Sequence, residues 1–175
     1  NEDTIEVFRG IPFAAPPVGP LRWMPPQTLP GTPQQLTTTR FAPACYQGEH
    51  ITKWYQSVVQ DFGGDPNVIE APQVSEDCLY LNVFTPTTAS DAKLPVLFWV
   101  HGGAHRFGTS TNMPGEELAS RGVVLVSINY RLGPLGFMSH PELTAEGCRG
   151  NQGLLDTVSA LQWVNRNITT FGGDP

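Results

Sequence analysis

The chain has 175 residues, of which 39% are apolar, and it carries a formal net charge of −6. This length allows a single domain, and the acidic balance argues against a nucleic-acid partner, because such partners require basic patches. No apolar run approaches the roughly 18 residues of a membrane span, and the first residues show neither the basic nor the apolar region of a signal peptide. Since 18 glycines and 17 prolines are spread between apolar segments, we expect a loop-rich globular protein that is not an integral membrane protein.

The N-terminal part predicts a short strand followed by an extended segment. Residues 6–13 are apolar enough for a strand, and the prolines in residues 14–27 exclude an ordinary helix there. A solvated linker would have no use for Leu21, Trp23 and Met24. We therefore expect residues 14–27 to pack on the surface of the domain.

The middle of the chain alternates between predicted strands and short helices. Residues 53–60 suit a short helix, and residues 75–86 alternate as a strand does. Residues 94–100 are almost all apolar and predict a strand buried on both faces. A short helix at 114–122 and a second buried strand at 123–129 follow, which together predict a parallel crossover.

The last predicted element is a helix over residues 154–168, ended by Gly172 and Gly173. We expect it to bury one apolar stripe made of Leu154, Val158, Leu161, Val164 and Ile168. Two buried parallel strands require further strands beside them and helices on both faces. The pattern predicts an α/β fold, with a mostly parallel central sheet flanked by helices, of which residues 1–175 are an incomplete piece.

A glycine-rich loop, His101-Gly102-Gly103-Ala104-His105, directly follows the predicted strand at 94–100. Paired glycines let the main chain turn tightly and expose its N–H groups, which are the donors that an oxyanion requires. Loops of this HGGG type form part of the oxyanion hole in esterases and lipases. Taken alone, the loop suits an oxyanion hole and a plain turn equally well.

Five ordered motifs extend this pattern over nearly the whole chain. They are FRGIPFAAPPVGPLRW (8–23), SEDCLYLNVFTP (75–86), WVHGGAHRFG (99–108), VSINYRLGPLGF (126–137) and GNQGLLDTVSALQWVNRNITTFGGDP (150–175). The chain resembles the type-B carboxylesterase and cholinesterase family of α/β-hydrolases. The resemblance implies that residues 1–175 form the N-terminal segment of a single α/β-hydrolase domain. Its G-x-S-x-G nucleophile elbow and the acid and histidine of its triad would lie beyond residue 175.

The resemblance also implies roles for residues of the glycine-rich loop. Gly103 and Ala104 would supply two N–H donors of the oxyanion hole, and His105, where relatives usually have a bulky residue, would line the acyl pocket. His101 is expected to brace the loop rather than take part in chemistry. Ser110 and Ser127 have no G-x-S-x-G context, so neither is expected to be the nucleophile.

Further roles implied by the resemblance are structural. The family's first disulfide matches Cys45 and Cys78, which leaves Cys148 free or paired with a residue outside this chain. Two framework ion pairs of the family match Arg22 with Glu76 and Arg131 with Asp156. A disulfide implies an oxidising compartment, hence a secreted or extracellular protein, and the sequon at Asn167 agrees as a glycosylation site.

Two functions remain as hypotheses. The first is a serine esterase or lipase that acts on a small-molecule or lipid ester through an acyl-enzyme, with the serine on a second segment or chain. The second is a non-catalytic, neuroligin-like adhesion protein of the same fold. A cholinesterase is not indicated, because residues 67–70 lack the tryptophan that binds choline there. We expect no cofactor and no metal, since Glu70, Glu76 and Asp77 lack metal-ligand spacing with any histidine or cysteine.

Overall fold

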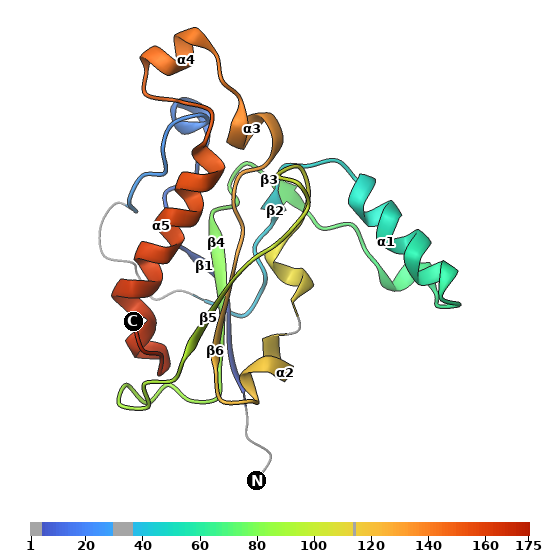
Figure 1. Ribbon diagram of the computed structural model, residues 1–175, viewed down its shortest axis with the longest axis vertical. Coiled ribbons are helices and arrows are strands. Elements are labelled where there is room, and N and C mark those ends of the chain that lie inside the picture. Colours follow the sequence, from blue (N-terminus) through green and yellow to red (C-terminus); the bar gives the residue numbers. More distant parts are fainter. Residues whose placement is uncertain (1–4, 30–36, 114) are drawn as a thin grey trace.

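A computed structural model describes residues 5–29, 37–113 and 115–175. Its centre is a mixed sheet of four strands in the order β1-β4-β6-β5, with helices on both sides (Figure 1). The strands β1 and β4 pair antiparallel, as do β4 and β6, whereas β5 and β6 pair parallel. The bounds of the strands are β1 Glu6–Pro12, β4 Tyr80–Thr85, β5 Val96–Val100 and β6 Val124–Ile128. A separate parallel pair joins β2, Ala44–Cys45, to β3, Val74–Ser75.

The predicted parallel crossover is confirmed. Strand β5 leads through η3, Ser110–Asn112, and the helix α2, Gly115–Ala119, into β6. The register pairs Val96 with Val124 and Val100 with Ile128. Pro114, where the sequence predicts the helix to begin, lies outside the described residues.

The sheet separates two apolar layers, because alternate residues of a strand point to opposite faces. One layer gathers Leu81, Val83, Val126 and Ile128 against the long helix α5, Gln152–Asn167. The other layer joins residues of β4 and β6 to α2 and consists of Phe84, Ala119 and Leu125 with their partly buried neighbours. Helices α5 and α2 accordingly lie on opposite sides of the sheet (Figure 1).

The predicted apolar stripe of α5 is wrong in its N-terminal half. Leu154, Val158 and Leu161 are 50%, 47% and 45% exposed, whereas Val164 and Ile168 are buried. The buried side of α5 consists instead of Gln152, Gly153, Asp156, Ala160 and Val164. Small residues occupy this side because the helix approaches the main chain closely: a side chain on Gly153 would overlap the carbonyl group of Arg131 and the ring of Phe137.

Strand β5 is also more exposed than predicted. Leu97 and Val100 are 43% and 40% exposed, so β5 is not buried on both faces. The reason is its position, because β5 is an edge strand of the sheet that the structure describes.

The proline-rich segment after β1 packs on the domain surface, as predicted. Its only regular element among the described residues is the short 3-10 helix η1, Gly19–Leu21. The indole N–H of Trp23 donates to the carbonyl oxygen of Pro134 at 3.2 Å. Pro134 belongs to α3, Gly133–Phe137, so the segment is held against α3.

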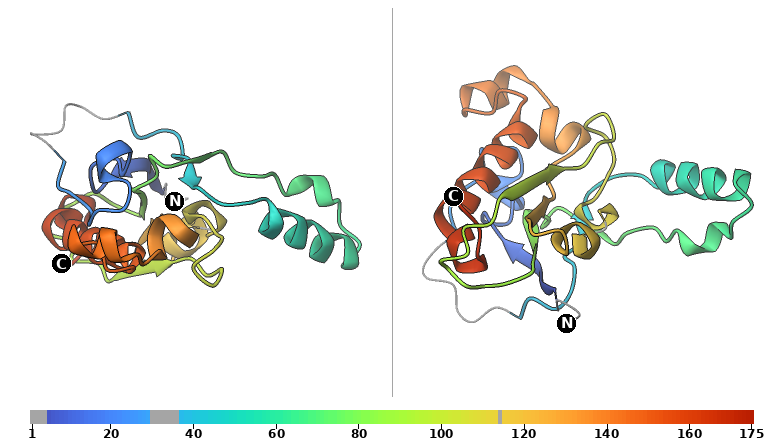
Figure 2. Two further views of the ribbon diagram at one scale, coloured as in Figure 1. Left: turned by 90° about the horizontal axis from the view of Figure 1, so that it is seen from above. Right: turned by 60° about the horizontal axis from the view of Figure 1, so that its bottom comes forward.

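The segment between β2 and β3 extends away from the sheet (Figure 2). It contains α1, His50–Asp61, and the 3-10 helix η2, Pro66–Val68, so the predicted helix at 53–60 is present and longer. Two further elements complete the described part: α4, Pro141–Ala145, and the 3-10 helix η4, Ile168–Phe171. None of the described helices is long and apolar enough to cross a membrane.

Candidate active site

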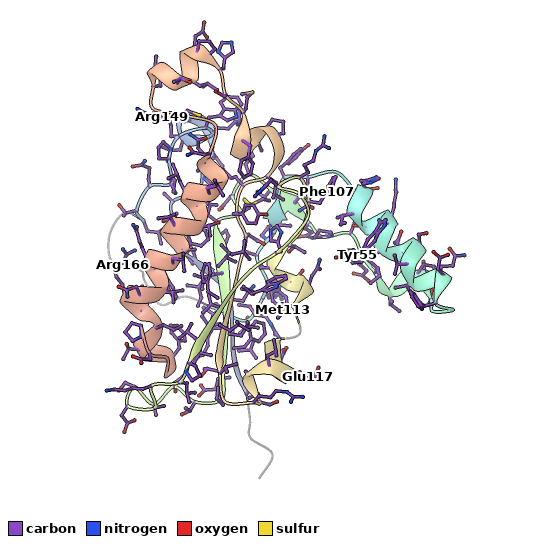
Figure 3. The ribbon with its side chains drawn as sticks, in the orientation of Figure 1. Tyr55, Phe107, Met113, Glu117, Arg149 and Arg166 are labelled. Carbon is purple, nitrogen blue, oxygen red and sulfur yellow. A yellow bond between two sulfur atoms is a disulfide. The ribbon has the colours of Figure 1, made fainter. Side chains whose placement is uncertain are left out.

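The glycine-rich loop leaves the carboxyl end of β5 and folds back on itself. Gly103, Ala104 and His105 all have positive φ, at 119°, 53° and 60°. The carbonyl oxygen of Gly103 accepts from the N–H groups of Arg106 at 3.0 Å and Phe107 at 3.1 Å, which closes a tight turn. Glycine is required at 103, because a Cβ there would overlap the carbonyl group of Phe107. Figure 3 marks Phe107 at this turn, with Tyr55 of α1 to its side.

This turn leaves the N–H groups of residues 102–105 without a hydrogen bond to any described residue, and Gly103 and Ala104 are the two that the resemblance assigns to an oxyanion hole. Gly103 is only half-buried and Ala104 is exposed, and each of them lines a cavity beside the loop. Adjacent main-chain donors of this kind can bind an oxygen that carries negative charge.

His101 lies buried beneath the loop. Its ring stacks on Tyr130 with 4.5 Å between centroids, and its Nδ1 lies 2.9 Å from the carbonyl oxygen of Gly102. The hydroxyl of Tyr130 donates to the carbonyl oxygen of His101 at 3.2 Å. Burial lowers the pKa of His101, which favours a neutral ring whose Nδ1–H donates to Gly102. These contacts suit a residue that supports the loop.

Two cavities flank the loop. One, of about 450 Å³, is lined on the loop side by Ala104, His105 and Arg106 and on the other side by residues 133, 134, 137 and 138. The ring of His105 lies 4.7 Å from that of Phe137, on the wall of this cavity. The second, of about 190 Å³, is lined by glycines 102, 103 and 108 together with side chains that include Ile51 and Tyr55 of α1. An ester carbonyl held at the loop would thus have space on either side.

Sequence reasoning missed Gln47, which contacts the far end of the loop. Its side-chain oxygen accepts from the N–H of Gly108 at 2.7 Å, and its Nε2 donates to the carbonyl oxygen of Gly108 at 2.7 Å. The same nitrogen lies 3.1 Å from the carbonyl oxygen of Cys45. The only sequence signal was its position two residues after a cysteine.

Ser110 and Ser127 are both buried and take part in a polar network between η3 and the sheet. The Nδ2 of Asn82 donates to the hydroxyl oxygens of Ser110 at 3.0 Å and Ser127 at 3.1 Å. The N–H of Ser110 donates to the side-chain oxygen of Asn129 at 2.8 Å. Neither hydroxyl faces the two cavities beside the loop.

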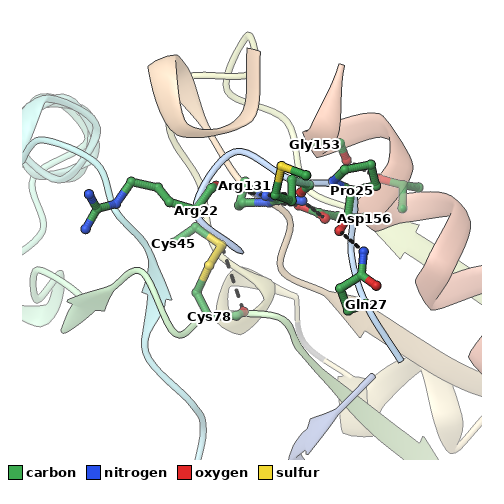
Figure 4. Close-up of polar contacts among 10 residues, drawn as sticks. Arg22, Pro25, Gln27, Cys45, Cys78, Arg131, Gly153 and Asp156 are labelled. Atoms are coloured by element: carbon green, nitrogen blue, oxygen red, sulfur yellow. Dashed lines mark hydrogen bonds and ion pairs between the residues drawn. A yellow bond between two sulfur atoms is a disulfide. The ribbon is translucent and has the colours of Figure 1, made fainter. Parts of the chain in front are cut away.

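The predicted disulfide and ion-pair residues lie close together: Arg22, Cys45, Glu76, Cys78 and Arg131 line one hollow, and Asp156 contacts Arg131. Figure 4 shows the two cysteines with Arg22, Arg131 and Asp156. Cys45 and Cys78 form a disulfide, with 4.9 Å between their Cα atoms. The Nε of Arg22 lies 2.6 Å from a carboxylate oxygen of Glu76, which raises the pKa of Arg22. Arg131 and Asp156 form a second pair at 2.7 Å, almost fully buried.

Two other predicted residues lie apart from the loop. Cys148 is buried and has no disulfide partner among the described residues. Asn167 is half-buried at the end of α5, where its Nδ2 donates to the carbonyl oxygen of Trp163 at 2.7 Å. Within the described ranges, no three His, Cys, Asp or Glu side chains gather as metal ligands would.

The sheet with its parallel crossover, and the glycine-rich loop at the end of the crossover's first strand, define an α/β-hydrolase. Solved structures agree. A thermophilic PNB esterase has a TM-score of 0.82 and 39% sequence identity, and the match covers all of this chain and 34% of the esterase chain. Aspergillus niger EstA has a TM-score of 0.79 and 34% identity; the match covers all of this chain and 31% of the EstA chain.

The model of the carboxylesterase family matches residues 1–175, and the chain belongs to this family. It is 43% identical over 179 residues to a fumonisin B1 esterase of Sphingopyxis macrogoltabida, covering 99% of this chain and 31% of that protein. It is also 43% identical over 192 residues to lipase 2 of Geotrichum candidum, with 99% of this chain and 34% of the lipase covered. The chain therefore spans about a third of the length of these relatives.

Proposed function

We propose that this chain supplies the oxyanion hole and part of the substrate pocket of a serine-dependent carboxylic-ester hydrolase. The observation that carries the proposal is the pair of unpaired N–H groups at Gly103 and Ala104, beside two cavities. Membership of the carboxylesterase family and the names of the relatives support the same chemistry. The substrate would be a small-molecule or lipid ester.

Residues 1–175 would form the N-terminal segment of a single α/β-hydrolase domain. The nucleophilic serine would lie in a G-x-S-x-G elbow outside these residues, on a further segment or a second chain. The relatives support this arrangement, since the match occupies only 31–34% of the first two. The burial of Ser110 and Ser127 is consistent with a nucleophile from elsewhere.

In the proposed mechanism, the serine oxygen attacks the ester carbonyl carbon while a histidine base accepts the hydroxyl proton. The carbonyl oxygen becomes an oxyanion and accepts hydrogen bonds from the N–H groups of Gly103 and Ala104. The bond from carbon to the alcohol oxygen then breaks, the histidine returns the proton to the departing alcohol, and an acyl-serine remains. Water cleaves the acyl-serine by the same steps. The N–H donors accelerate both stages because they bind the oxyanion more strongly than the neutral carbonyl.

His105 would form a wall of the pocket for the acyl group. Its ring and that of Phe137 lie 4.7 Å apart on one side of the larger cavity. Met138 adds a second apolar side chain to the lining beside Phe137, which suits an acyl chain.

The compartment would be oxidising, and the protein secreted or extracellular. The disulfide between Cys45 and Cys78 supports this, because reducing compartments rarely hold such bonds. Glycosylation at Asn167 is compatible with the geometry there, since a glycosylated amide keeps one N–H for the carbonyl oxygen of Trp163.

A fluorophosphonate that reacts with activated serines tests the proposal. It is applied to a longer polypeptide, in which this chain is joined to segments like those that its relatives have outside the matched region. We expect hydrolysis of p-nitrophenyl esters and covalent label on one serine of a G-x-S-x-G elbow outside residues 1–175. Label on Ser110 or Ser127 would contradict the mechanism.

The alternative is a non-catalytic, neuroligin-like adhesion protein. The chain is 36% identical over 205 residues to mouse neuroligin-3, covering 24% of that protein. The same experiment separates the two, because an adhesion protein would show neither serine label nor ester hydrolysis.

A further inference from the structure

The last residue of the loop, Gly108, packs against its beginning. A Cβ at Gly108, whose φ is 121°, would overlap the ring of His101 and the carbonyl oxygen of Gly102. Gly108 is buried, and the intervening turn is closed by two hydrogen bonds to the carbonyl oxygen of Gly103. The position of Gly108 therefore limits where the N–H groups inside the loop can lie.

Gln47 holds Gly108 by both of its main-chain polar groups. The side-chain amide accepts from the Gly108 N–H and donates to the Gly108 carbonyl oxygen, each at 2.7 Å. This reciprocal pattern requires one donor and one acceptor side by side, which only an amide or a protonated carboxyl provides among side chains of this length. Within the described residues, no other side chain forms a hydrogen bond with the main chain of Gly108.

Gln47 is itself fixed at its base. It follows β2 by two residues, and β2 is paired with β3 and ends at the disulfide-bonded Cys45. The amide nitrogen also donates to the carbonyl oxygen of Cys45 at 3.1 Å. The contact thus connects the disulfide region to the glycine-rich loop across 61 positions of sequence.

We propose that Gln47 is a positioning residue that holds the loop in the conformation in which the N–H groups of Gly103 and Ala104 meet the ester oxygen. This inference rests on the proposed function for its catalytic consequence. Gln47 lines neither of the two cavities beside the loop, so its loss should lower kcat more than it raises KM. A displacement of donors by about 1 Å can cost on the order of 100-fold in rate.

The first variant is Gln47→Met, which keeps the length of the side chain but removes its amide. In a polypeptide that contains this chain and the remaining segments of its relatives, we expect kcat to fall on the order of 10- to 100-fold with a small change in KM. The matched control is Gln56→Met, in the same disulfide loop, where a half-buried glutamine donates one hydrogen bond, to Ile69. Unchanged kcat in Gln47→Met, or an equal loss in Gln56→Met, would overturn the proposal.

The second variant, Gln47→Glu, adds a pH-dependent readout. An ionised carboxylate accepts from the Gly108 N–H but repels the carbonyl oxygens of Gly108 and Cys45, whereas a protonated carboxyl restores the reciprocal pair of bonds with Gly108, though not the bond to Cys45. We expect the ratio of variant to wild-type kcat to rise as the pH falls toward the ordinary glutamate pKa of about 4.3. A ratio that stays flat with pH contradicts the proposal, because a general loss of packing would not recover on protonation.

Hydrogen exchange gives a readout that does not depend on activity. In Gln47→Met we expect amides of the peptide covering 102–108 to exchange on the order of tenfold faster than in wild type, with no change in Gln56→Met. Unchanged exchange would overturn the role of Gln47 even in an active enzyme. If wild type hydrolyses no ester, the proposed function fails, while the exchange data still decide whether Gln47 holds the loop.

Discussion

Arg131 donates three hydrogen bonds to the carboxylate of Asp156, two to one oxygen and one to the other. Its Nε and Nη2 donate at 2.8 and 2.7 Å, and its main-chain N–H donates at 3.0 Å. Nη1 of the same guanidinium donates to the carbonyl oxygens of Arg22 and Met24. One buried ion pair therefore joins the segment after β6, the helix α5 and the proline-rich segment. Burial raises the pKa of Asp156, and the hydrogen bonds and charge of Arg131 oppose that rise.

We predict that Asp156→Asn lowers the free energy of unfolding by about 3–5 kcal/mol, because the guanidinium of Arg131 is left buried without a counter-charge. Urea unfolding measures the change. The control is Glu116→Gln, which removes the partner of Arg9 in an exposed pair at 3.1 Å and should cost at most about 1 kcal/mol. Similar losses in both variants would mean that the buried pair of Arg131 and Asp156 stabilises the fold no more than an exposed pair does.

The face of α5 shows where periodicity alone misleads. A stripe of large apolar residues was the natural prediction, yet Leu154 is half exposed while Asp156 is completely buried. Periodicity assumes that a helix meets its neighbours through large side chains. Here α5 approaches the main chain of Arg131 so closely that glycine, alanine and a paired carboxylate occupy the contact.

Of the candidate site, the glycine-rich loop could be predicted from the sequence, whereas its contact with Gln47 and part of its main-chain conformation could not. The loop, its glycines and its place after a strand follow from the sequence, because paired glycines directly after an apolar run mark the point where a strand ends in a tight turn. The contact between Gln47 and Gly108 could not be predicted, since a hydrogen bond across 61 positions leaves no local pattern. The positive φ of Ala104 was equally hidden, because alanine rarely adopts it.

We predict that of two small substitutions in the loop, one lowers kcat and the other leaves it nearly unchanged. Gly103→Ala should lower kcat by about 10²–10³, because the new Cβ overlaps the carbonyl group of Phe107 and displaces the N–H donors. Ala104→Gly keeps its N–H and tolerates the positive φ of 53°, so it should retain nearly full kcat. Ester hydrolysis assays measure both. Full activity in Gly103→Ala would mean that the donors lie elsewhere.

Proline at position 104 is not a clean test of the N–H donor there. Proline there would remove the N–H, but its φ is locked near −65°, far from the observed 53°. Loss of activity in Ala104→Pro would therefore reflect a broken turn as well as a lost donor. The pair Gly103→Ala and Ala104→Gly keeps every N–H of the loop, so it tests where the donors lie and not the loss of one donor.

We predict that His101 makes stability depend on pH. Burial lowers the pKa of His101 in the folded protein below its ordinary value of 6.5, so the unfolded chain binds a proton that the folded chain does not. The contribution of His101 to the free energy of unfolding is complete above pH 6.5, where its ring is neutral in both states. As the pH falls toward the lowered pKa, the unfolded chain is protonated first, and the free energy of unfolding falls by up to about 1.4 kcal/mol per pH unit. His101→Phe, which can keep the stacking on Tyr130, should lack this slope in urea unfolding. Coincident slopes for wild type and variant would contradict the prediction.

The last prediction concerns the disulfide between Cys45 and Cys78, which closes a loop with a sequence separation of 33. Replacing both cysteines by alanine should lower the free energy of unfolding by about 4 kcal/mol, because the unfolded chain regains the freedom that the closed loop denies it. Urea unfolding measures the loss, and Cys148→Ala is the control, since this buried cysteine closes no loop within the described residues. Its loss should be clearly smaller. Peptide mapping without reductant should find Cys45 joined to Cys78, and a bond from Cys45 to Cys148 would contradict the assignment.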